Sequence, residues 1–86
     1  MDYKGFKIWL ISNQNYSKAT ISNIVSRAKR ANNILPWYND IIYLFMLERE
    51  DKYECLSSSV KSQIKKAIKL YFEYVTEKES KVKEDF

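Results

Sequence analysis

Two stretches of the sequence combine basic side chains with short polar ones at helical spacing. At about 100° per residue, each set falls on or beside one side of a helix, opposite an apolar stripe. The first set is Lys18, Ser22, Asn23, Ser26, Arg27, Lys29 and Arg30, and the second is Lys61, Ser62, Lys65, Lys66 and Lys69. Lysine and arginine neutralise phosphates, while serine and asparagine hydrogen-bond to phosphates or base edges. The two sets therefore indicate contact with a nucleic acid.

Acidic residues are missing from both stretches. No Asp or Glu lies between Thr20 and Asn39 or between Leu56 and Phe72. Solvated helix faces usually intersperse Glu with Lys, so a basic face without carboxylates favours an anionic partner. The formal net charge is only +4 because other segments are acidic; residues 48–59, for example, hold four acids and two bases. An ordinary solvated face is the alternative interpretation for either helix taken alone.

The residue types of catalysis are poorly represented. The chain has no His, which removes the commonest general base and zinc ligand. The serine run 57–59 has no surrounding Gly-x-Ser-x-Gly motif, so it predicts a helix N-cap rather than a nucleophile. The lone Cys55 is expected to be a partly buried, unreactive thiol, which suits a reducing cytoplasm. We therefore expect a non-enzymatic protein with no cofactor, no metal and no small-molecule substrate.

The elements that must position these side chains are helices. A chain of 86 residues with one Gly and one Pro holds a single domain and few tight hairpin turns, so an all-α, four-helix bundle is expected. Apolar periodicity predicts the helices near residues 2–13, 18–34, 39–50 and 58–79. The domain would then span residues 1–79, with a frayed tail over 80–86. No apolar run approaches the roughly 20 residues of a membrane span, so no membrane partner is expected.

The expected core follows from the same periodicity. The helix at 39–50 is apolar almost all round and is predicted to lie at the centre, and the acidic segment 48–54 is predicted to form a loop. Trp37 and Tyr38 could plug the core or form an exposed contact, and the sequence leaves this open. The aromatic residues assigned to the core are Phe6, Trp9, Phe45, Tyr71 and Phe72.

Several of these segments resemble a known family. The segments are Phe6-Lys7-Ile8-Trp9-Leu10, Tyr16-Ser17-Lys18-Ala19-Thr20-Ile21, Val25-Ser26-Arg27-Ala28-Lys29-Arg30, Leu56-Ser57-Ser58-Ser59-Val60-Lys61-Ser62-Gln63-Ile64 and Leu70-Tyr71-Phe72-Glu73-Tyr74. Together they are similar to the N-terminal core-binding, SAM-like domain of tyrosine recombinases and phage integrases. The resemblance implies a four-helix domain that clamps one side of duplex DNA, with its second and fourth helices facing the major groove.

Two departures from that family limit what the resemblance implies. Ile24 stands where such domains often carry Tyr, and the catalytic domain that would follow, with its Arg, Lys, His and nucleophilic Tyr, is absent from the sequence. The expectation is therefore a non-catalytic DNA-binding domain, either a fragment of a recombinase, a free-standing relic or a mobile-element protein. The alternative is a small helical protein-binding module or phage-borne inhibitor, which an exposed apolar patch around Trp37 and Tyr38 would favour.

Overall fold

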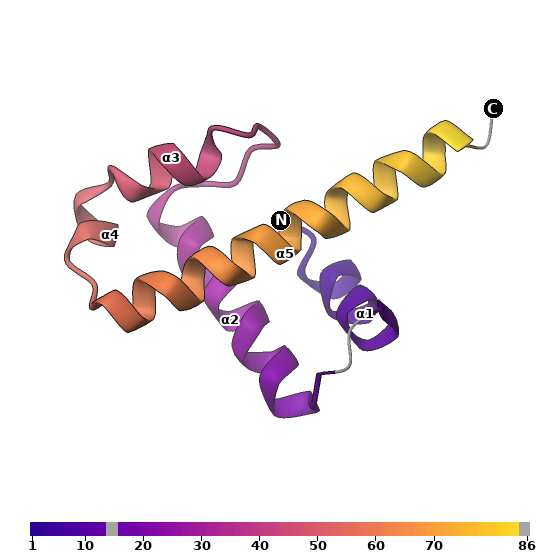
Figure 1. Cartoon of the computed structure of the whole chain (residues 1–86), viewed down its shortest axis with the longest axis horizontal. Helices are drawn as coiled ribbons and strands as arrows, with labels where there is room; N and C mark the ends of the chain where they lie inside the picture. The colour runs from indigo at the N-terminus through magenta and orange to yellow at the C-terminus, as the bar shows by residue number, and fades with distance from the viewer. Residues whose placement is uncertain (14–15, 85–86) are drawn as a thin grey trace.

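Five helices and no strand make up the part of the chain that the computed structural model describes, residues 1–13 and 16–84, with side chains described as far as Glu79. The helices are α1 (Tyr3–Asn13), α2 (Lys18–Ile34), α3 (Tyr43–Glu48), α4 (Asp51–Glu54) and α5 (Ser58–Glu84). Figure 1 shows the long α5 crossing α2, with α1 on one side of this crossing and α3 and α4 on the other. The all-α class is confirmed.

The ends of α2 lie where the sequence predicts them. Ser17 caps the start, because its Oγ accepts a hydrogen bond from the backbone N–H of Thr20 at 3.2 Å. At the other end Leu35 has extended backbone angles, φ −139° and ψ 113°, because the following Pro36 disfavours the helical region. The outer face of α2 is therefore carried on a helix that is fixed at both ends.

The start of α5 confirms the N-cap interpretation of the serine run. The Oγ of Ser57 accepts from the backbone N–H of Val60 at 3.4 Å, and its carbonyl accepts from Lys61 at 2.9 Å. The helix then continues to Glu84, past the expected end at residue 79. The frayed tail over 80–86 stays a prediction, since residues 85–86 lie outside the described part of the chain.

The core consists of two clusters of buried side chains that share α5. The first joins α1 and α2 to α5 through Phe6, Leu10, Ile21, Ile24, Ala28, Ala67, Leu70, Tyr71 and Tyr74. The second joins the end of α2, α3 and α4 to α5 through Ala31, Tyr43, Leu47, Tyr53, Ile64 and Ile68. Both clusters use the apolar stripe of α5, so this helix organises the whole molecule.

Trp37 lies between the two clusters. Its ring centroid is 4.8 Å from that of Tyr43 in one cluster and 4.8 Å from that of Tyr71 in the other. A further edge contact of 4.7 Å joins it to Phe72. Trp37 therefore plugs the core, whereas its neighbour Tyr38 remains 37% exposed.

The prediction that the third helix forms the centre of the core is wrong. Residues 39–42 are not helical, and the shorter α3 buries only Tyr43 and Leu47, a single pair at i, i+4 spacing. Phe45, which was assigned to the core, is 58% exposed. The longer stripes of α2 and α5 bury each other and occupy the centre, so α3 packs at the edge with one face only.

The segment after α3 also differs from the prediction. Its expected loop contains the single turn α4, whose Tyr53 is 2% exposed and donates its hydroxyl to the carbonyl of Lys61 at 3.1 Å. Cys55 is exposed rather than partly buried. It directly follows α4, which directs Tyr53 into the core and leaves Cys55 on the outer side.

Candidate nucleic-acid interface

The outer face of α2 presents the first predicted set as one surface. Its members are exposed except for the half-buried Arg27, while Ile21, Ile24, Ala28 and Ala31 are buried on the opposite side. We call this surface the α2 face; it consists of Lys18, Ser22, Asn23, Ser26, Arg27, Lys29 and Arg30. Because the buried side packs against the core, the polar side chains are held along one exposed side of a helix with a fixed orientation.

A pocket of about 340 Å³ lies along one edge of the α2 face, where α1 packs against α2. Its polar lining has three lysines and two serines, and neither helix contains a carboxylate. The lining residues are Tyr3, Lys4, Lys7, Ser22, Val25, Ser26 and Lys29. Ammonium and hydroxyl groups that converge without a competing acid suit the oxygens of a phosphate.

Lys4 and Lys7 were not among the predicted site residues. They lie at i, i+3 on α1, and only the packing of α1 on α2 brings them to Ser22 and Ser26. The absence of any acid from Tyr3 to Asn39 was the available sequence signal. The Nζ of Lys29 also lies 5.3 Å from the centre of the Tyr3 ring, which draws the lysine toward α1.

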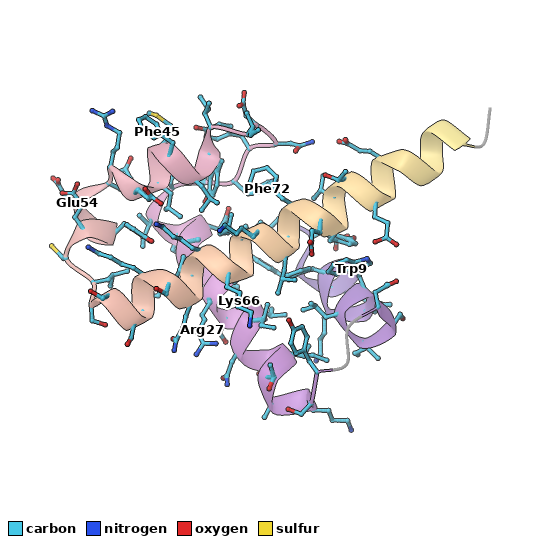
Figure 2. All side chains as sticks on the ribbon, in the orientation of Figure 1. Trp9, Arg27, Phe45, Glu54, Lys66 and Phe72 are labelled. Atoms are coloured by element: carbon cyan, nitrogen blue, oxygen red, sulfur yellow. The ribbon has the colours of Figure 1, made fainter. Side chains whose placement is uncertain are left out.

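The opposite edge of the α2 face meets α5. Figure 2 shows Arg27 and Lys66 near each other in the view, beside the crossing of the two helices. The Nζ of Lys66 lies 5.9 Å from the centre of the Tyr16 ring, just ahead of α2. Lys66 therefore extends the basic surface of α2 onto the flank of α5.

Two other predicted lysines of α5 are turned toward α3 and α4 instead. Lys65 forms an ion pair of 2.7 Å with Glu48, and this carboxylate raises the pKa of the lysine. The Nζ of Lys61 lies 5.9 Å from the centre of the buried Tyr53 ring. Both cations are engaged with the protein's own groups on the side away from Lys66.

The remaining α5 residues of the second set point away from α2. Ser62 and Lys69 are exposed and lie opposite the buried stripe of Ile64, Ala67 and Tyr71. Since the buried stripes of α2 and α5 pack against each other, the outer faces of the two helices point in opposite directions. The structure therefore joins Lys66 to the α2 face and does not place the two predicted sets on one surface.

Among the residues that the structure describes, no group of three or more Cys, Asp and Glu side chains is arranged to hold a metal ion. Likewise, none of the described helices is both long and apolar enough to cross a membrane.

Comparison with known proteins gives no match to a family model, a curated protein or a solved structure. The functional argument therefore rests on the geometry of the α2 face and its two edges.

Proposed function

We propose that this chain is a non-catalytic protein that binds duplex DNA through the α2 face. The observation that carries the proposal is the pocket between α1 and α2, where Lys4, Lys7 and Lys29 converge with two serine hydroxyls and no carboxylate. A groove of this composition holds a backbone phosphate and fixes the register of the protein on the duplex.

The shape of the α2 face fits the major groove, which at about 12 Å wide admits one α-helix. Ser22, Asn23 and Ser26 lie along the exposed ridge, where they would meet base edges. The cations at the two edges, Lys29 on one side and Arg27 on the other, would meet the phosphates of the flanking strands. Ser22 and Ser26 also line the phosphate pocket, so they lie between the phosphate contacts and the base contacts, and Asn23 is the base-edge candidate away from the pocket.

The proposal includes the likeness to the core-binding domains of tyrosine recombinases. In this arrangement α2 enters the groove and α5 contributes Lys66 from its flank, while the outer face of α5 points away from the duplex, so the family's two-helix arrangement is met only in part. Ile24, which departs from that family's pattern, is 5% exposed and belongs to the core. Its change therefore affects packing rather than contact with DNA.

The test is fluorescence anisotropy of a labelled mixed-sequence duplex, titrated with the chain at about 50 and 200 mM salt. We expect binding that weakens steeply with salt, and a Lys29→Glu variant that binds more weakly at both salt concentrations. Lys52→Glu is the matched control, because it makes the same charge change on the exposed surface of α4. No binding of the parent at the lower salt, or equal losses in both variants, would refute the proposal.

A second candidate function is a small protein-binding module, such as a phage-borne inhibitor. The observation that favours it is a set of exposed apolar side chains at Ile41, Ile42, Phe45 and Met46. This set begins three residues after Tyr38, whereas such a patch was expected around Trp37 and Tyr38. The same titration separates the two functions, since a protein-binding module has no reason to show a salt-dependent affinity for DNA.

A further inference from the structure

The outer side of α3 is apolar where the protein's own chain leaves it uncovered. Ile41 is 89% exposed and Phe45 58%, whereas Tyr43 and Leu47 on the inner side of the same helix are buried. We call the exposed set the α3 patch; it consists of Ile41, Ile42, Phe45 and Met46. Apolar patches of this kind mark interaction sites, because their burial removes apolar surface from water.

Carboxylates lie at both ends of the α3 patch. The exposed Asp40 directly precedes it and accepts a hydrogen bond of 3.0 Å from the backbone N–H of Ile42, which holds this acid beside the patch. Three further acids follow the other end, and they are Glu50, Asp51 and Glu54. None of these four carboxylates forms an ion pair with any residue that the structure describes.

Two cations lie among these acids and do not neutralise them. The guanidinium carbon of Arg49 lies 5.2 Å from the centre of the Phe45 ring, so an aromatic face holds this cation. Lys52 is exposed on α4. Residues 40–54 hold five acids and two bases, and one of the acids, Glu48, is paired with Lys65 of α5. The surroundings of the α3 patch therefore have a net negative charge.

This charge distinguishes among the molecules that could cover the α3 patch. A second copy of the chain would bring two acidic surroundings together, and like charges placed opposite each other weaken an interface. Nucleic acids and anionic lipid surfaces are disfavoured for the same reason. A partner with cations at both ends of an apolar stripe matches the patch and the acids together.

We propose that the α3 patch binds a basic amphipathic helix of another protein, one whose apolar stripe has lysine or arginine at each end. The patch forms a ridge along α3, against which a second helix can pack. Asp40 and Glu50 are ten positions apart, which corresponds to about 15 Å, or about three helical turns. Cations about three turns apart on the partner lie against the two acidic ends, and its apolar side chains cover Phe45.

The proposed surface is separate from the α2 face. In Figure 2, Phe45 lies on α3 on the other side of α5 from Arg27 and Lys66. A helix bound at α3 leaves the α2 face uncovered, so the inference does not rest on DNA binding. It gives the second candidate function a partner of stated chemistry. Failure of the DNA titration and failure of the experiments below are separate results.

The first experiment selects helical peptides against the full chain from a displayed library. The peptides share an apolar stripe, and their end positions vary among lysine, glutamate and serine. We expect the selected peptides to carry lysine at both ends and to bind Phe45→Ala about 30-fold more weakly, as for a central contact residue. No peptide whose binding depends on Phe45, or ends with no excess of lysine over glutamate, overturns the proposal.

Ile11→Ala is the matched control for this selection. Ile11 is 60% exposed, and it lies on α1, on the other side of the crossing of α2 and α5 from α3 (Figure 1). Its truncation removes a similar exposed apolar side chain without touching the α3 patch. We expect unaltered affinity for the selected peptides, and equal losses in Ile11→Ala and Phe45→Ala overturn the proposal.

A charge reversal tests the acidic ends. Asp51→Lys should weaken binding of a selected lysine-ended peptide about fivefold and strengthen binding of its glutamate-ended counterpart. Glu73→Lys is the matched control, because it makes the same charge change at an exposed position of α5 beside Trp9 of α1. Circular dichroism shows whether both variants are folded. Equal effects of the two folded variants overturn the assignment of a basic partner.

Removal of Arg49 gives an independent answer. Its cation lies over Phe45 and repels a basic partner, so Arg49→Ala should bind the lysine-ended peptide about fivefold more tightly. Weaker binding would mean that Arg49 pairs with an acid of the partner, and it would overturn the proposal.

Sedimentation equilibrium of the chain alone tests the remaining occupant. We expect a monomer from micromolar to millimolar concentration, because the acidic surroundings of two patches repel each other. A dimer that Phe45→Ala abolishes would assign the α3 patch to a second copy of the chain and overturn the proposal.

Discussion

The hydroxyl of Tyr74 donates a hydrogen bond of 2.7 Å to the carboxylate of Asp2, and this bond ties the first turn of the chain to the middle of α5. The other carboxylate oxygen of Asp2 accepts from the backbone N–H of Gly5 at 3.0 Å and so caps α1. The backbone N–H of Asp2 donates to the hydroxyl of Tyr71 at 2.7 Å. Asp2 therefore joins α1, which carries Lys4 and Lys7, to α5, in addition to the packing of the buried Phe6 and Leu10.

Asp2 should make the stability of the fold sensitive to acid. The hydrogen bonds from Tyr74 and then from Gly5 lower the pKa of its carboxyl below 3.8. A lowered pKa in the folded state adds stability above pH 3.8, and this stability is lost as the pH falls through the lowered value. Because the carboxylate is exposed, we expect Asp2→Asn to cost only about 0.5 kcal/mol at neutral pH. In urea unfolding the difference should vanish in strong acid; a difference that is the same at every pH would contradict this account.

Gly5 leaves the space that this contact needs. A methyl group at Gly5 would overlap the Asp2 carboxylate and the Tyr74 hydroxyl. Alanine favours a helix by about 1 kcal/mol over glycine, yet crowding costs about 1–3 kcal/mol, so Gly5→Ala should lower the free energy of unfolding. Ser12→Ala, on the exposed surface of the same helix, should be neutral or slightly stabilising. A Gly5→Ala variant that is more stable than the parent would show that Asp2 and Tyr74 move apart at no cost.

The parts of the fold that the sequence predicted are those that local chemistry decides. The hydroxyls of Ser17 and Ser57 cap their helices by accepting hydrogen bonds from backbone N–H groups three residues along the chain. Pro36 ends α2 because its ring disfavours the helical conformation of the residue before it. The position of α3 could not be predicted in this way, because a run apolar on every side does not say which side meets the core. Tyr53 was missed because a single aromatic among charged residues has no periodicity.

The candidate site was predictable one helix at a time. Helical projection placed Ser22, Ser26 and Lys29 on one exposed side correctly. It carries no information on how two helices are oriented, so it could neither bring Lys4 to α2 nor separate Lys69 from it. These relationships depend on long-range packing around α5.

Tyr53, expected in a loop, should contribute more to stability than Phe45, expected in the core. Removing the buried ring in Tyr53→Ala should cost about 3–5 kcal/mol, since it leaves a cavity between α4 and α5. Phe45→Ala removes an exposed ring and should stay within about 0.5 kcal/mol of the parent. Both are measured by denaturant unfolding. Equal costs for the two variants would refute the placement of α3 and α4.

Buried tyrosines should make the fold sensitive to alkali. Burial is the main cause that raises the pKa of Tyr43 and of Tyr74 to about 12. A raised pKa in the folded state adds stability that is complete below pH 10 and is lost as the pH rises through about 12. We expect phenolate absorbance to show a late-titrating group of tyrosines whose ionisation coincides with unfolding. Ionisation of every tyrosine near pH 10 with the fold intact would contradict this prediction.

The opposed directions of the two basic faces predict an asymmetry in DNA binding. Arg27→Ala with Lys66→Ala removes one cation of the α2 face and one beside it, whereas Lys65→Ala with Lys69→Ala removes two from the side of α5 turned away from that face. Each lost phosphate contact lowers the slope of log affinity against log salt by about 0.9, so the first pair should lower it by about 1.8 and the second by little. Anisotropy titrations over a salt series measure both slopes, with circular dichroism to confirm folding after the loss of the Lys65–Glu48 ion pair. Equal decreases in slope for the two double variants would contradict this prediction. They would mean that DNA contacts both outer faces, which a straight duplex cannot do with one copy of this fold.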